Sequence, residues 1–188
     1  MVAFARAGAH GSDAVSATRP PTRYGFSGTR YLRDLRRAGE LVVVGELEAV
    51  LADAPERAEY TTGACVGTDA FIGAWLWRHA PRALHRVVVP ADRSRVESWW
   101  LHRAIREAAG SYGVEVEEMG PGTSYRDRNL RIVERSDVLV AFPAYGEDDP
   151  RSLRSGTWQT VRMARRAGLE VRVVVLGGSD EASPRRRR

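Results

Sequence analysis

The chain has 188 residues, of which 43% are hydrophobic, enough for one domain with a substantial core. No apolar run approaches the about 20 residues that a membrane-spanning helix needs, and the first residues lack the apolar stretch of a secretion signal, so we expect a cytoplasmic protein. All 29 basic residues are arginines, which excludes a lysine Schiff base and the phosphate loop that ends in Gly-Lys-Ser/Thr.

Charge is concentrated at the end of the sequence. The formal net charge is +5, and residues 185–188 are four consecutive arginines, so the rest of the chain is close to neutral. We interpret this run as a solvated tail, with contact to a nucleic acid or an acidic partner as the alternative. The single cysteine, Cys65, excludes an internal disulfide and a multi-cysteine metal site, in agreement with a reducing compartment.

The ends of the chain differ from its middle. Residues 1–21 show no helical or strand period and end in two prolines, which predicts a flexible N-terminal arm. Residues 178–188 predict a disordered, arginine-rich C-terminal tail. The domain is predicted over residues 22–177, and its first strand, at 23–27, runs into the turn Gly28-Thr29-Arg30.

The next predicted helix spans residues 46–54, and residues 41–44 are either a short strand or the first turns of that helix. A strand at 58–60 then leads into a glycine-containing turn that ends in Gly67-Thr68-Asp69, and a helix follows at 70–79. Thr68 or Asp69 can cap this helix, whose free N–H groups and dipole would attract a phosphate. The alternative is a tight connection with no ligand.

Strands and helices continue to alternate in the second half. Strands are predicted at 86–89, 114–118, 138–142 and 171–176. A capping box at residues 94–97 predicts a helix that ends before Gly110, and further helices are predicted around 128–135 and from Ser155 to Gly168. The polar segment 144–154 is predicted to be a loop long enough to serve as a lid.

The predicted fold is α/β. Continuous apolar strands separated by helices indicate a mainly parallel central sheet in a Rossmann-like three-layer α/β/α arrangement. In such sheets ligands bind beyond the carboxyl ends of the strands, where the strand order reverses. We therefore expect the turns at 28–30, 62–69, 90 and 142–157 to share one edge.

Four motifs in this order resemble the SLOG superfamily, the Rossmann-like group that includes the Lonely Guy phosphoribohydrolases and DNA-processing protein A. The resemblance covers about residues 24–176 and implies a nucleotide or nucleotide-derived ligand, with phosphates on the glycine turns and the base near the strand ends. The motifs are Gly28-Thr29-Arg30, then Thr62-Gly63-Ala64 with Gly67 and Asp69, then Arg128-Asn129, and finally Ser155-Gly156-Thr157.

The predicted binding set joins these motifs with one strand-end aromatic residue. Trp158 and Tyr145 could also stack on a base, although the core is the favoured place for Trp158. The predicted nucleotide- and phosphate-binding residues are Gly28, Thr29, Arg30, Thr62, Gly63, Ala64, Gly67, Thr68, Asp69, Arg128, Asn129, Phe142, Ser155, Gly156 and Thr157.

One departure from the family pattern bears on activity. Lonely Guy enzymes resemble Pro-Gly-Gly-x-Gly-Thr-x-x-Glu in the last motif, where the glutamate assists loss of the base, but Thr160 stands at that position here. A threonine cannot supply the negative charge that stabilises an oxocarbenium-like state. We therefore expect ligand binding, and we leave open an N-glycosidase in which Asp69 or one of Glu147, Asp148 and Asp149 replaces the glutamate.

The expected ligand is AMP, ADP-ribose, an NAD-related compound or a signalling nucleotide. A dinucleotide dehydrogenase is not expected, because the turn after the second strand lacks the Gly-x-Gly-x-x-Gly spacing. We expect no further cofactor and no metal site, since His79, His85 and His102 show no metal-ligand spacing. A homodimer is left open, and a nucleic-acid or interaction role would depend on the arginine tail.

Overall fold

A computed structural model describes residues 22–32, 36–54, 58–108 and 113–177. The predicted arm at 1–21 and tail at 178–188 lie outside these residues. Strands and helices alternate along the described chain, in the order β1 (Arg23–Gly28), α1 (Arg36–Asp53), β2 (Glu59–Gly63), α2 (Thr68–His79), β3 (Leu84–Val89), α3 (Ser98–Ala108), β4 (Val114–Glu118), α4 (Tyr125–Glu134), β5 (Val138–Phe142), the 3-10 helix η2 (Pro150–Arg154), α5 (Gly156–Arg166) and β6 (Glu170–Val173).

The six strands form one parallel sheet in the order β4-β3-β2-β1-β5-β6. The chain builds outward from β1 to β4 and then returns through α4 to the other side of β1, where β5 pairs with it from Tyr24 opposite Val138 to Gly28 opposite Phe142. The strand order therefore reverses between β1 and β5. This point is where a parallel α/β sheet opens a crevice at its carboxyl edge.

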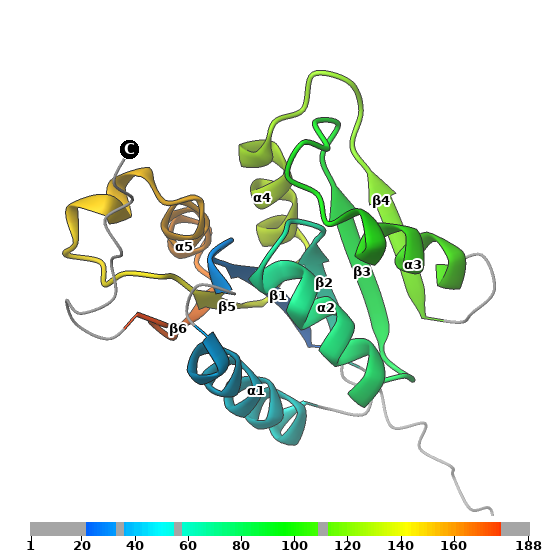
Figure 1. Cartoon of the computed structure of the whole chain (residues 1–188), viewed down its shortest axis with the longest axis horizontal. Coiled ribbons are helices and arrows are strands. Elements are labelled where there is room, and N and C mark those ends of the chain that lie inside the picture. Colours follow the sequence, from blue (N-terminus) through cyan, green and yellow to red (C-terminus); the bar gives the residue numbers. More distant parts are fainter. Residues whose placement is uncertain (1–21, 33–35, 55–57, 109–112, 178–188) are drawn as a thin grey trace, which may run out of the picture.

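Helices cover both faces of the sheet, so the fold is a three-layer Rossmann-like α/β/α arrangement and the predicted fold class is confirmed. Figure 1 shows α1 and α5 on opposite sides of β1 and β5. The strand β5 is buried at every position because both of its faces are covered. Val138, Val140 and Phe142 join the core on the α1 and α2 side, while Leu139 and Ala141 join the core on the α4 and α5 side.

Two elements near the N-terminus are longer than predicted. The helix α1 begins at Arg36, so residues 41–44 belong to it, and Val43 is fully buried one turn before the equally buried Leu47. The strand β2 continues to Gly63, so Thr61 and Thr62 pair with β3 and are not part of a turn.

The predicted capping box before α3 is wrong. The helix begins at Ser98, because the preceding residues pair with the segment after β2: Val96 forms a β-bridge with Cys65, and the Glu97 amide donates to the Ala64 carbonyl at 2.8 Å. A capping box instead opens α4, where Ser124 and Asp127 each accept a hydrogen bond from the other's backbone amide.

The segment predicted as a loop between β5 and α5 contains the short helix η2. Pro150 opens it, and the Asp149 carboxylate accepts a hydrogen bond from the Arg151 amide at 2.8 Å. Within the described residues, no helix combines the length and the apolar character needed to cross a bilayer.

Candidate functional site

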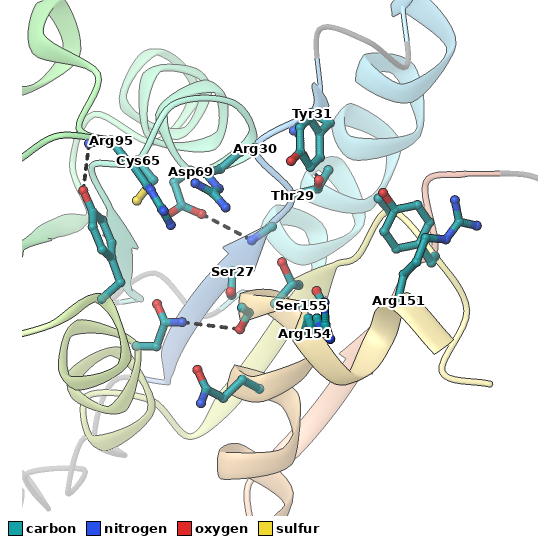
Figure 2. A pocket seen from close by; sticks show the side chains of 18 of the residues that line it. Ser27, Thr29, Arg30, Tyr31, Cys65, Asp69, Arg95, Arg151, Arg154 and Ser155 are labelled. Atoms are coloured by element: carbon teal, nitrogen blue, oxygen red, sulfur yellow. Dashed lines mark hydrogen bonds between the residues drawn. The ribbon is translucent and has the colours of Figure 1, made fainter. Parts of the chain in front are cut away.

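A pocket of about 440 Å³ opens at the carboxyl ends of β1, β2 and β5, where the strand order reverses. Figure 2 shows side chains from separate parts of the chain converging on it. The turn after β1, the start of α2, the start of α4 and the segment from η2 into α5 each contribute part of the wall. The lining residues are Ser27, Gly28, Thr29, Arg30, Tyr31, Cys65, Asp69, Arg95, Tyr125, Arg128, Asn129, Ala144, Tyr145, Arg151, Arg154, Ser155, Gly156, Thr157 and Gln159.

The structure brings together most of the predicted set. The predicted residues that line the pocket are Gly28, Thr29, Arg30, Asp69, Arg128, Asn129, Ser155, Gly156 and Thr157. The predicted residues outside the lining are Thr62, Gly63, Ala64, Gly67, Thr68 and Phe142. Phe142 is fully buried in the core, and so is almost all of Trp158, whose indole N–H donates to the Tyr145 carbonyl at 2.8 Å.

The glycine turn before α2 supports the site from behind. The N-cap of α2 is Gly67, and no side chain caps the helix, so the predicted capping by Thr68 or Asp69 is wrong. The Thr68 amide and hydroxyl both donate to the Thr29 carbonyl, at 3.1 and 2.7 Å. Gly67 has φ of 87° and lies against the backbone of Arg30, so only glycine fits there without strain. This turn therefore fixes the 28–30 turn in place.

A buried ion pair forms the wall between β1, α2 and α4. The Asp69 carboxylate accepts from the Arg128 guanidinium at 2.6 Å and from the Gly28 amide at 3.2 Å. Burial is the largest single influence on the pKa of Arg128 and acts to lower it, but attraction from Asp69, Cys65 and Tyr125 and the hydrogen bond to Asp69 together leave that pKa above its ordinary value. The second guanidinium nitrogen lies 2.9 Å from the Cys65 sulfur. Burial raises the pKa of the Cys65 thiol to about 11, so the thiol stays protonated at neutral pH.

The absence of a side chain at Gly63 makes room for this pair. A Cβ at Gly63 would overlap the Arg128 guanidinium and come within 2.6 Å of the Asp69 carboxylate. The glycine predicted to approach a ligand therefore accommodates an arginine of the protein itself. Arg128 is 5% exposed, and its Nε is buried with no hydrogen-bond partner among the described residues.

The N-terminus of α5 opens directly on the pocket. Ser155 is its N-cap and accepts a hydrogen bond from the Trp158 amide at 3.3 Å. No hydrogen bond among the described residues uses the Gly156 or Thr157 amide. These N–H groups lie at the positive end of the helix dipole, an arrangement that favours an anion.

Asn129 stands beside this helix start and is 6% exposed. Its Nδ2 donates to the Gly156 carbonyl at 3.4 Å, which fixes the orientation of the amide. Its Oδ1 is buried and accepts no hydrogen bond from the described residues. The wall therefore carries one unused acceptor next to two unused amide donors.

Arginines and tyrosines make up much of the rim. Arg30 and Arg154 form no ion pair with the described residues. The Arg95 guanidinium lies 5.5 Å from the centre of the Tyr125 ring, and that of Arg151 lies 3.9 Å from the Tyr145 ring and pairs with Asp149. Figure 2 shows Arg95 and Arg151 on opposite sides of the pocket, with Arg30 between them.

The lining carries five arginines and one carboxylate, Asp69. Asp69 is already neutralised by Arg128, so the pocket is strongly positive. The other candidate carboxylates lie outside the lining: Glu147 pairs with Arg165 at 2.7 Å, and Asp149 pairs with Arg151. The arrangement can hold an anion but offers no free carboxylate to its ligand.

Thr160 is fully buried beneath the start of α5. Its hydroxyl donates to the Gly156 carbonyl at 2.9 Å and accepts from the Ser27 hydroxyl at 3.3 Å. Both contacts are within the protein, so Thr160 links α5 to β1.

Several lining residues were not in the predicted binding set. Tyr145, Arg151 and Arg154 follow β5 in the segment predicted as a lid, so their place in the chain was a usable signal. Arg95 comes from the connection after β3 and Tyr125 is the first residue of α4, and no local pattern indicates that they reach the β1 edge. The full list is Ser27, Tyr31, Cys65, Arg95, Tyr125, Ala144, Tyr145, Arg151, Arg154 and Gln159.

No family model, curated protein or solved structure matches this chain. The resemblance to the SLOG superfamily therefore stays a prediction. Among residues 22–32, 36–54, 58–108 and 113–177, no group of three or more His, Cys, Asp or Glu side chains is placed to hold a metal ion.

Proposed function

We propose that this protein binds a nucleotide or nucleotide-derived ligand, such as AMP, ADP-ribose, an NAD-related compound or a signalling nucleotide, in the pocket between β1 and β5. The observation that carries the proposal is the N-terminus of α5, where backbone amides face the pocket without hydrogen-bond partners among the described residues. The Gly156 and Thr157 amides have no partners among the described residues, and Arg30 and Arg154 line the pocket without acidic partners there. A phosphate at this place would receive main-chain and charge-assisted hydrogen bonds together.

The rest of the pocket suits the nucleoside part of such a ligand. Tyr31, Tyr125 and Tyr145 contribute aromatic surface to the wall, and Tyr31 is 52% exposed. A base can stack on such rings, since every base has a π-face. The volume of about 440 Å³ lies within the range of about 300–1,000 Å³ that is usual for small-molecule sites.

The site favours binding over cleavage of an N-glycosidic bond. That reaction needs a carboxylate near the anomeric carbon to stabilise the oxocarbenium-like state. Asp69 is held by Arg128 and by the Gly28 amide, and Thr160 is buried and bonded to Ser27. We therefore place a sensor or sequestering role ahead of a phosphoribohydrolase.

A thermal-shift and calorimetry series tests the proposal. AMP, ADP-ribose, NAD and a cyclic dinucleotide are compared with adenosine and inorganic phosphate, and a ligand at 100 times its Kd adds about 2.7 kcal/mol of stability. We expect Arg30→Ala with Arg154→Ala to weaken binding. The matched control is Arg126→Ala with Arg166→Ala, two exposed arginines outside the pocket. Equal stability with and without every nucleotide would contradict the proposal.

A further inference from the structure

The arginines of the pocket that have no acidic partner fall into two groups, one on each side of the carboxyl end of β1. Figure 2 shows Arg154 at the start of α5, and Arg30 and Arg95 on the other side, toward α2. Backbone contacts place the second group there. The Val66 amide donates to the Arg95 carbonyl at 3.0 Å, and Gly67, the N-cap of α2, lies against the backbone of Arg30.

Arg30 and Arg95 bring positive charge to the wall that contains Cys65. Burial is the largest influence on the pKa of the thiol and raises it, but the charges of Arg128, Arg30 and Arg95 act to lower it. The three guanidinium groups are therefore close to the sulfur, since charge interactions weaken with distance. Among the described residues, Arg128 is paired with Asp69, whereas Arg30 and Arg95 form no ion pair.

Arg95 is held in place although it lies in a connection between elements. Its amide donates to the Tyr125 hydroxyl at 2.8 Å, and its carbonyl is fixed by the Val66 amide. Its guanidinium lies 5.5 Å from the centre of the Tyr125 ring, and the Arg128 guanidinium lies 5.9 Å from the same centre. A wall that holds like charges close together attracts an anion, because the anion reduces their repulsion.

One phosphate at the start of α5 does not reach this wall. The Gly156 and Thr157 amides lie beyond β5, whereas the segment bonded to Arg95 follows β2, and β1 lies between these two strands. Neighbouring strands are about 4.8 Å apart, so β2 and β5 are separated by about 10 Å. A phosphate bound to the α5 amides therefore leaves the Arg95 guanidinium, beside Tyr125, without an anion.

We propose, on the basis of the proposed function, that the ligand carries two phosphoryl groups, one at the start of α5 with Arg154 and the other on the α2 side with Arg95. Arg30 lies between these two places and can bind either group. The planar guanidinium of an arginine donates paired hydrogen bonds to phosphate oxygens. The ligand is then a nucleoside diphosphate or another nucleotide with two phosphates, in place of a monophosphate.

Titration calorimetry with a series of adenosine compounds tests the number of phosphates. Adenosine, AMP, ADP and adenosine 3′,5′-bisphosphate share one base and one ribose. ADP joins its two phosphates directly, whereas the bisphosphate holds them apart. We expect the better of these two compounds to bind at least about ten times more tightly than AMP, because a second set of charge-assisted hydrogen bonds forms.

The series separates this proposal from the one on which it rests. If AMP binds as tightly as ADP and the bisphosphate do, the second phosphate has no site, although the pocket still binds a nucleotide. If none of the phosphorylated compounds binds, both proposals are overturned.

Arginine variants test where the second phosphate binds. Arg95→Ala keeps the backbone hydrogen bonds of the residue and removes its charge. We expect it to lower the preference for the two-phosphate compound over AMP by about tenfold. Arg154→Ala should weaken both compounds and keep the ratio of their affinities.

Arg93→Ala is the matched control, because Arg93 is an exposed arginine of the same connection that pairs with Glu118 outside the pocket lining. It should leave both affinities unchanged, and thermal unfolding without ligand checks that every variant is folded. A preference that Arg95→Ala leaves intact would overturn the proposal. So would an equal loss with Arg93→Ala, since general attraction between charges would then explain the preference.

Discussion

Replacing Gly156 with proline would remove one hydrogen-bond donor from the pocket and put the ring Cδ in the place of the amide hydrogen. Gly156 is the first residue of α5, and its N-cap, Ser155, has φ of −78° and ψ of 124°. Proline is favoured at the first helical position, and the residue before it prefers this extended conformation. The comparison variant is Gly156→Ala, which keeps the N–H and adds a Cβ whose nearest neighbour is Asn129 Nδ2 at 3.9 Å.

The size of the effect follows from the kind of hydrogen bond. A bond from an amide to a charged group contributes about 1.5–3 kcal/mol, and about 1.4 kcal/mol is a factor of ten in affinity. We therefore expect Gly156→Pro to bind its nucleotide about 10 to 150 times more weakly than Gly156→Ala does. The Thr157 amide and the arginines remain, so binding is weakened and not abolished.

Titration calorimetry on both variants measures the difference, and thermal unfolding without ligand checks that both are folded. Adenosine is the internal comparison, because it lacks the phosphate and should bind the two variants alike. Equal affinity of Gly156→Pro and Gly156→Ala for the phosphorylated ligand would refute the placement of the phosphate at the start of α5.

Three further outcomes follow from the site. Asp69→Asn leaves the Arg128 guanidinium buried without its counter-charge, so the free energy of unfolding measured in urea should fall by about 3–5 kcal/mol. The double variant Asp69→Asn with Arg128→Met should recover much of this loss. An unchanged urea midpoint for Asp69→Asn would contradict the prediction. Folding raises the pKa of the Cys65 thiol from 9.0 to about 11. Between pH 9 and 11 the unfolded chain therefore releases a proton that the folded chain keeps. The free energy of unfolding should then fall by about 1.4 kcal/mol for each pH unit of rise in this window. Cys65→Ala should show a shallower decline over that window, whereas parallel curves for the two proteins would exclude the effect. Incubation with AMP should release no adenine above a protein-free blank, because no free carboxylate lines the pocket; chromatographic detection of adenine would restore the hydrolase alternative.

The fold and much of the pocket were predictable because their signals are local. Apolar runs such as Val138–Phe142 and the helical spacing between them indicate strands buried on both faces. The rule that ligands bind at the carboxyl edge predicts that Gly28, Asp69 and Gly156 meet at one place, and all three line the pocket. The predicted start of a helix near Ser155 agrees with α5, which begins at Gly156 with Ser155 as its N-cap.

The remaining features depend on contacts between distant segments. Ser94 and Glu97 match a capping box, but pairing of Val96 with Cys65 holds that stretch extended. Gly63 looks like a ligand-binding glycine, and only the approach of Arg128 from α4 explains it. Sequence spacing cannot reveal that an arginine so much later in the chain fills that space.

The pocket lies on the junction between β1 and β5, the two neighbours in the sheet that are farthest apart in the chain. The Arg23 amide at the start of β1 donates to Asp137 just before β5, a separation of 114 positions along the sequence. Contacts of such long range form late and slowly in folding, since a large loop must close first. A phosphorylated ligand bound by Arg30 on one side and by Arg154 on the other would connect the two sides of this junction. The same geometry means that a nascent chain has no pocket until α5 has been synthesised.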